Sequence, residues 1–161
     1  MSEAAIPMAR DTVTVTEPFE SLYQREFRPM VRLATALVDA PEQAEEVVQE
    51  AFAAVFLRYR VLEHPEAYLR VCVLNGGRKV LRRRRLLRRQ PPPAEEYGSL
   101  GFNHVIDAVR RLPTKQRNVV MLRYELQLSD QEIADTLGIP LGTVKSTLHR
   151  ALARLRTEVS P

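Results

Sequence analysis

Between Arg88 and Gly101 the chain carries three consecutive prolines, Pro91-Pro92-Pro93, followed by short polar and glycine residues. Proline donates no backbone hydrogen bond and glycine weakens helices, so this stretch neither continues a helix nor supplies core side chains. The 161-residue chain is therefore expected to divide here into two small units joined by a flexible, Pro-rich tether. The expected parts are a lead-in over 1–17, a first unit over 18–87, the tether over 88–101 and a second unit over 102–158.

On both sides of the tether, apolar residues recur every three or four positions, the period of a helix with one buried face. The first unit shows three such segments, which begin at Phe19, Pro41 and Pro65, and the first of them is either one helix or two with a break near Pro29. In the second unit we expect one helix near 105–112, another after Pro113 and two more in the last thirty or so residues. No alternating strand pattern occurs, so the predicted fold is all-α, with two small helical domains.

The net charge of +4 hides two unlike halves, because residues 1–77 carry seven basic and twelve acidic side chains, whereas residues 78–161 carry seventeen and eight. A basic half suits nucleic acid, and an acidic half suits a protein partner. Charges interrupt every apolar run before the roughly 18 residues of a membrane helix. We therefore expect a cytoplasmic protein without a membrane contact. Cys72, the single cysteine, is expected to be a core thiol and not a redox site.

The segment SDQEIADTLGIPLGTVKSTLHRALARLR, residues 129–156, predicts a helix-turn-helix. Ser129 and Glu132 have the spacing of a capping box, which starts a helix. Gly138 suits the left-handed turn that ends this helix, and Pro140 prevents it from resuming before a second helix begins near Leu141.

With Val144, Leu148 and Ala151 turned inward, the polar side chains of the second helix share its outer face, where they can donate to bases and phosphates of duplex DNA. The other interpretation is an amphipathic hairpin with a solvated basic face. The predicted DNA contacts are Thr143, Lys145, Ser146, His149, Arg150 and Arg154.

Two stretches resemble the extracytoplasmic-function type of bacterial sigma factors, within about 19–85 and 104–156. QAEEVVQEAF, residues 43–52, resembles the family's region that docks on the clamp of the largest RNA polymerase subunit. The run from Leu112 to Arg156 resembles its fourth region, including Gln116-Arg117 and GTVKS. The resemblance implies a three-helix-type region 2 over 18–87, a region 4 over 102–158, and Arg117 as a further contact to the upstream promoter element.

The resemblance also implies two sets of contacts in the first unit. Core polymerase would meet an acidic helix face, which charge alone would leave as a merely solvated face: Glu42, Glu45, Glu46, Gln49 and Glu50. Downstream DNA would be opened by the following loop and helix, where cations and planar groups can hold a single strand: His64, Tyr68, Arg70, Asn75, Arg78, Arg82 and Arg83. The chain has no tryptophan, Phe56 and Tyr59 can equally be core residues, and the arginine run 82–85 can equally be a solubilising helix end.

The predicted function is that of a sigma factor, which binds core RNA polymerase, recognises promoter DNA and supports transcription initiation. No phosphate loop, catalytic triad or metal-ligand spacing occurs, so we expect no enzyme activity and no cofactor. The main alternative is a stand-alone helix-turn-helix regulator whose first unit senses a ligand or dimerises, and a third is a protein-binding adaptor. Relatives are often held inactive by an anti-sigma protein, but nothing in this sequence specifies one.

Overall fold

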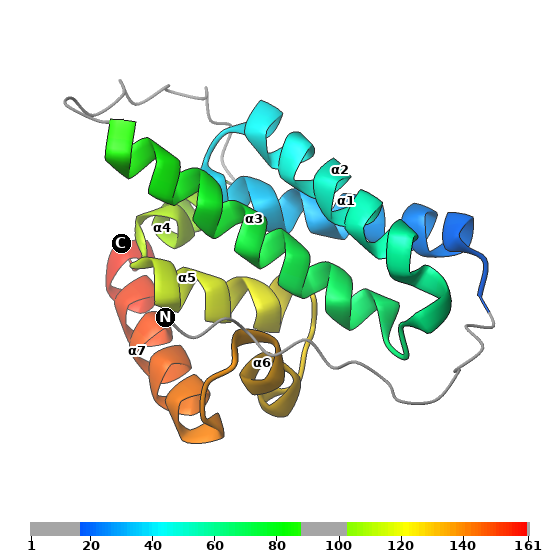
Figure 1. The fold of residues 1–161 in the computed structure, drawn as a ribbon. Helices are drawn as coiled ribbons and strands as arrows, with labels where there is room; N and C mark the ends of the chain where they lie inside the picture. The colour runs from blue at the N-terminus through cyan, green and yellow to red at the C-terminus, as the bar shows by residue number, and fades with distance from the viewer. Residues whose placement is uncertain (1–16, 88–102, 161) are drawn as a thin grey trace.

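The structure is a computed structural model that describes residues 17–87 and 103–160. The expected tether over 88–101 and the lead-in up to residue 16 lie outside the described residues. All regular elements in the described ranges are helices, as predicted (Figure 1). None of these helices is long and apolar enough to cross a membrane.

The first three helices, α1 (Phe19–Val38), α2 (Pro41–Arg58) and α3 (Pro65–Leu87), pack pairwise into one bundle. Pro41 stands at the start of α2, where its missing N–H costs nothing. Helix α1 continues through Pro29 without a break and ends at Asp39, which takes the left-handed conformation with φ of 52°. Of the two alternatives for this segment, the single helix is therefore the correct one.

Helix α3 passes close to both of its neighbours at a pair of glycines. A Cβ at Gly76 would lie 2.8 Å from Cγ1 of Val47 on α2, and one at Gly77 would lie 3.3 Å from Cδ1 of Leu37 on α1. A short helix, η1 (Tyr59–Val61), joins α2 to the loop before α3. The two glycines therefore set how closely α3 approaches the other helices of the bundle.

The C-terminal half contains α4 (Asn103–Arg111), α5 (Thr114–Val120), α6 (Asp130–Leu137) and α7 (Leu141–Val159). Helix α5 widens at its end into a π-type segment, η2 (Met121–Glu125), in which the N–H of Leu126 donates to the carbonyl of Met121 at 3.3 Å. Gln127 then takes a left-handed conformation with φ of 54°. This irregular connection turns the chain from α5 into α6.

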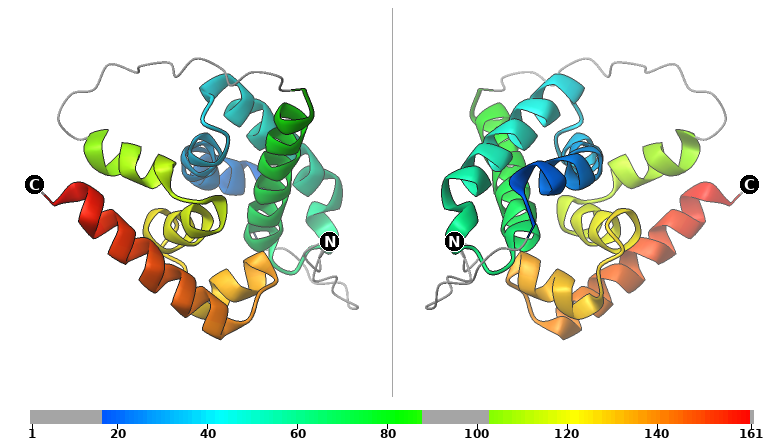
Figure 2. Two further views of the ribbon diagram at one scale, coloured as in Figure 1. Left: turned by 90° about the vertical axis from the view of Figure 1, so that its left-hand side faces the viewer. Right: turned by 90° about the vertical axis from the view of Figure 1, so that its right-hand side faces the viewer.

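The two halves pack against each other. One continuous cluster of buried apolar side chains extends from the three-helix bundle to Val119, Leu122 and Ile133 of the C-terminal half. Helices α4 and α5 and the η2 segment contact α1, and α6 contacts α3. Figure 2 shows α7 as the outer arm of the C-terminal half, with α5 between it and the bundle. The sequence predicted the helices of each unit but not this shared core.

Candidate nucleic-acid interface

The helix-turn-helix begins at the predicted capping box. The backbone N–H of Glu132 donates to Oγ of Ser129 at 3.2 Å, and the N–H of Ser129 donates to Oε2 of Glu132 at 2.8 Å. This hydrogen bond from the Ser129 backbone stabilises the carboxylate and lowers the pKa of Glu132. Helix α6 ends at Gly138, whose φ is 64°, and α7 starts at Leu141 after Pro140. The cap, the turn and the second helix are all confirmed as the sequence predicted them.

Helix α7 holds its polar side chains on the side away from the core. Val144 and Ala151 are fully buried, and Leu148 is half-buried against them. Arg150 lies along the helix, with its Nε donating to the carbonyl of Ser146 at 3.3 Å. Six predicted contacts are exposed on this side, and we call them the recognition face: Thr143, Lys145, Ser146, His149, Arg150 and Arg154.

Arg117 does not belong to the recognition face. Its half-buried guanidinium donates through Nη2 to the carbonyls of Arg110 and Leu112, at 2.6 and 3.1 Å, and through Nη1 to the carbonyl of Ala36 at 3.1 Å. Burial lowers the pKa of this arginine. In this arrangement the side chain has no path to DNA, so the predicted contact is corrected to one that joins the two halves of the chain.

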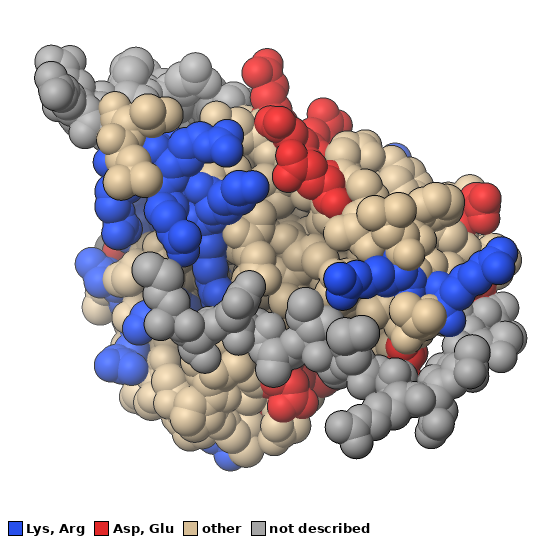
Figure 3. Space-filling view, in the orientation of Figure 1, with Lys and Arg blue, Asp and Glu red and all other residues tan. Residues whose placement is uncertain are grey.

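The strand-opening candidates on α3 fall into two groups. Asn75, Arg82 and Arg83 are exposed and Arg78 is partly exposed, on the half of α3 where lysines and arginines gather (Figure 3). At the other end of the helix, Tyr68 is only 7% exposed, so it cannot stack on an unpaired base unless the bundle opens.

The beginning of α3 is acidic as well as basic. His64 lies 4.0 Å from a carboxylate oxygen of Glu63 and 3.8 Å from one of Glu66. Arg70 is half-buried, and its Nε has no hydrogen-bond partner among the described residues. The predicted set therefore does not form one uniform surface.

The predicted docking residues of α2, Glu42, Glu45, Glu46, Gln49 and Glu50, are all exposed. They share a face that is acidic along one half of the helix (Figure 3). The same face continues into Phe56 and Leu57, whose side chains are 62% and 84% exposed. The sequence analysis left Phe56 as a possible core residue. Its spacing of seven residues from Gln49 is the signal that places it on the outer face.

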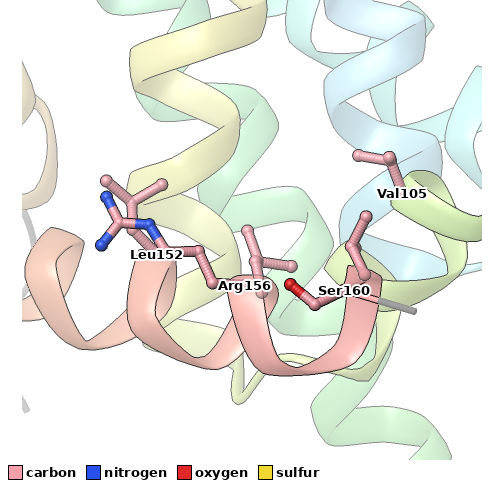
Figure 4. Close-up of a pocket in the computed structure, with 6 residues that line it drawn as sticks. Val105, Leu152, Arg156 and Ser160 are labelled. Carbon is pink, nitrogen blue, oxygen red and sulfur yellow. The ribbon is translucent and has the colours of Figure 1, made fainter.

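An apolar groove lies between α4 and the end of α7, with a volume of 430 Å³. Figure 4 shows Val105 of α4 facing the side of α7 that carries Leu152 and Arg156. Leu155, Val159 and Ser160 complete the lining. In the part of the chain that the structure describes, no three His, Cys, Asp or Glu side chains are placed to hold a metal ion.

Comparison with known proteins adds to this geometry. Residues 103–155 match the family described as sigma-70, region 4. The RNA polymerase sigma-E factor of Streptomyces coelicolor is 36% identical over 153 residues, which cover 88% of this chain and 85% of that protein. The sigma-E factor of Streptomyces antibioticus is also 36% identical, with coverage of 88% and 84%.

Two solved structures share the fold. The sigma factor RpoE, in complex with the anti-sigma factor NepR from Bartonella quintana, has a TM-score of 0.73 at 22% identity and covers 89% of this chain and 98% of its own. CnrH, in complex with the cytosolic domain of CnrY, has a TM-score of 0.66 at 23% identity, with coverage of 86% and 85%.

Proposed function

Because the chain belongs to the extracytoplasmic-function sigma factors of the sigma-70 superfamily, we propose that its surfaces divide promoter binding and polymerase binding between the two halves. RNA polymerase sigma factors are initiation factors and not catalysts. The domains proposed for these tasks are residues 18–87 as region 2 and residues 102–158 as region 4. The recognition face of α7 is the single observation that carries this proposal.

In this proposal, α7 reads the upstream promoter element. The capped α6 and the Gly138 turn hold α7 against the core by Val144 and Ala151, so that its opposite side can enter a major groove. Arg150 and Lys145 are the strongest candidates for base and phosphate contacts, because long cations reach both. Arg117 is left out of this set, since its hydrogen bonds point into the protein.

The exposed cations of α3 are proposed to hold DNA as it opens. Arg82 and Arg83 are exposed, and exposed guanidinium groups suit the phosphates of an unpaired strand. Asn75 offers an amide for a base edge, and Arg78 adds a further cation. Tyr68 is left out because its ring is buried in the bundle.

The outer face of α2 is proposed to bind core polymerase, at the clamp of its largest subunit. An exposed row of carboxylates that leads into Phe56 and Leu57 combines charge with an apolar anchor. Protein interfaces commonly pair such an anchor with a polar rim. A merely solvated helix face would have no reason to expose Phe56 and Leu57 beside the acidic residues.

The remaining proposals concern location and regulation. We place the protein in the cytoplasm, where its DNA and its polymerase would be. An anti-sigma partner is also proposed, because the two solved relatives were crystallised with proteins of that kind or with a cytosolic domain. The apolar groove between α4 and α7 offers such a partner 430 Å³ of space lined by Val105, Leu152 and Leu155.

Transcription with purified core polymerase tests the division of tasks. Promoter duplex and a pre-melted template are compared for three variants, E46K/E50K, R150A and R82A/R83A. The first should fail to recruit core on either template, the second should fail on duplex by roughly 1–3 kcal/mol of binding, and the third should fail chiefly in opening duplex. If all three act alike on both templates, or if the chain never supports transcription, the stand-alone regulator is favoured.

A further inference from the structure

The contacts between the two halves lie along one stripe of α1. Arg32 pairs with Glu125 of η2, the carbonyl of Ala36 accepts from Arg117, and Oδ1 of Asp39 lies 3.4 Å from Nε of Arg110. Positions 32, 36 and 39 are four and three residues apart, so they share one face of the helix. Leu33 and Leu37 face the core beside them. Helix α1 therefore serves two partners, its own bundle and the C-terminal half.

Arg117 is the best anchored of these contacts. It joins two carbonyls of the C-terminal half to one of α1, and it does so from a half-buried position. Hydrogen bonds from a charged donor are stronger than neutral ones and gain further where water is excluded. Arg32 and Asp39, by comparison, are exposed and contribute less.

A second contact joins α6 to the beginning of α3. The two helices enclose a cavity of 320 Å³, lined on the α3 side by His64 and Arg70 and on the α6 side by Glu132 and Asp135. The Nε of Arg70 is buried there without a hydrogen-bond partner among the described residues, and the charge of Arg70 helps to lower the pKa of Glu132. An arginine predicted to hold phosphate thus faces carboxylates of the helix-turn-helix.

We propose that the free chain is self-occluded, with Arg117 fastening the C-terminal half onto α1 so that α6 covers Arg70 of the strand-opening helix. This inference rests on the proposed function. Carboxylates of α6 and phosphates of an unpaired strand would compete for the same arginine. Strand binding then requires the halves to part first, and the apparent affinity falls by the fraction of chains that are closed.

The occlusion is partial. The side chain of His64 stays 61% exposed at the rim of the cavity. The recognition face and the acidic face of α2 are also exposed in the closed arrangement. Core polymerase can therefore meet the closed chain, and opening can follow that encounter. The surface withheld until then is the one that binds single-stranded DNA.

The test uses the full chain with Cys72→Ser, carrying dyes at the exposed positions Ala53→Cys on α2 and Ala153→Cys on α7. Asp135→Lys places a cation against Arg70 and should force α6 off α3. Glu158→Lys, at the far end of α7, makes the same charge change away from that contact and is the matched control. Arg117→Lys keeps the charge but loses the guanidinium fork.

Energy transfer between the dyes measures the separation of the halves, and fluorescence anisotropy measures binding of a short A/T-rich single-stranded oligonucleotide. The proposal expects lower transfer in Asp135→Lys and Arg117→Lys than in Glu158→Lys. It also expects strand binding by Asp135→Lys to be about tenfold tighter than by Glu158→Lys. Equal transfer in all variants, or equal strand affinity in the two lysine variants of α6 and α7, overturns it. If the dyes separate but no variant binds the strand, closure stands and the proposed strand-opening role fails.

Discussion

Gly76→Ala is expected to destabilise the protein although alanine is the better helix former. In an exposed helix this change stabilises by about 1 kcal/mol. At position 76, however, the added Cβ would lie 2.8 Å from Cγ1 of Val47, well inside the optimal carbon separation of roughly 3.5–4.0 Å. Val47 is 4% exposed and β-branched, so its rotamer cannot easily change inside a helix.

Overpacking of this kind costs about 1–3 kcal/mol, so the net loss in the free energy of unfolding should be about 1 kcal/mol. Urea unfolding followed by circular dichroism gives the measurement. Gly142→Ala is the matched control, because nothing lies within 4 Å of a Cβ there, and it should stabilise by about 0.5–1 kcal/mol.

A double-mutant cycle with Val47→Ala isolates the contact between α3 and α2. Val47→Ala alone removes buried methyl groups and should cost about 2 kcal/mol. In the double variant the new Cβ occupies part of the vacated space, so the combined loss should fall short of the sum by about 1 kcal/mol. Additive losses, or a Gly76→Ala variant as stable as the unchanged chain, would refute the close approach of the two helices.

Three further predictions concern the helix-turn-helix and the turn before it. Ser129→Ala removes the cap of α6 and should lower the free energy of unfolding by about 1 kcal/mol in urea. Glu132 has a folded pKa below its unfolded value because of the hydrogen bond from Ser129; its stabilising effect should be present above about pH 4.3 and disappear as the pH falls through the folded pKa, so an unfolding series against Glu132→Gln should show the two proteins converging in acid. Gln127→Gly should raise the thermal midpoint, with a gain of about 1 kcal/mol, because the left-handed backbone at φ of 54° is strained for glutamine; an unchanged midpoint would mean that contacts of the glutamine side chain offset that strain.

Local features were predictable from the sequence because short-range chemistry determines them. The capping box at Ser129, the turn at Gly138 and the proline at the start of α2 each involve residues within one turn of one another. The exposed side of α7 followed in the same way from the period of a single helix. The family resemblance rested on these stretches too.

Features that depend on contacts between distant segments were missed or misplaced. Arg117 was predicted to reach DNA, yet its partners include a carbonyl 81 residues away. Tyr68 was predicted to stack on a base, but its burial depends on how the bundle closes. Phe56 was left undecided, because the helical period alone does not say whether a neighbouring helix covers it. Long-range packing leaves little local signal in one sequence.

The lone thiol of Cys72 gives this protein a built-in clock for the breathing of its bundle. Cys72 is half-buried on α3 beside Tyr68, and burial raises the pKa of its thiol. Only the thiolate reacts with alkylating reagents, so the folded state should be modified slowly. The modification rate of the unlabelled chain thus counts how often α3 lifts from its neighbours, including movements too brief to change a spectrum.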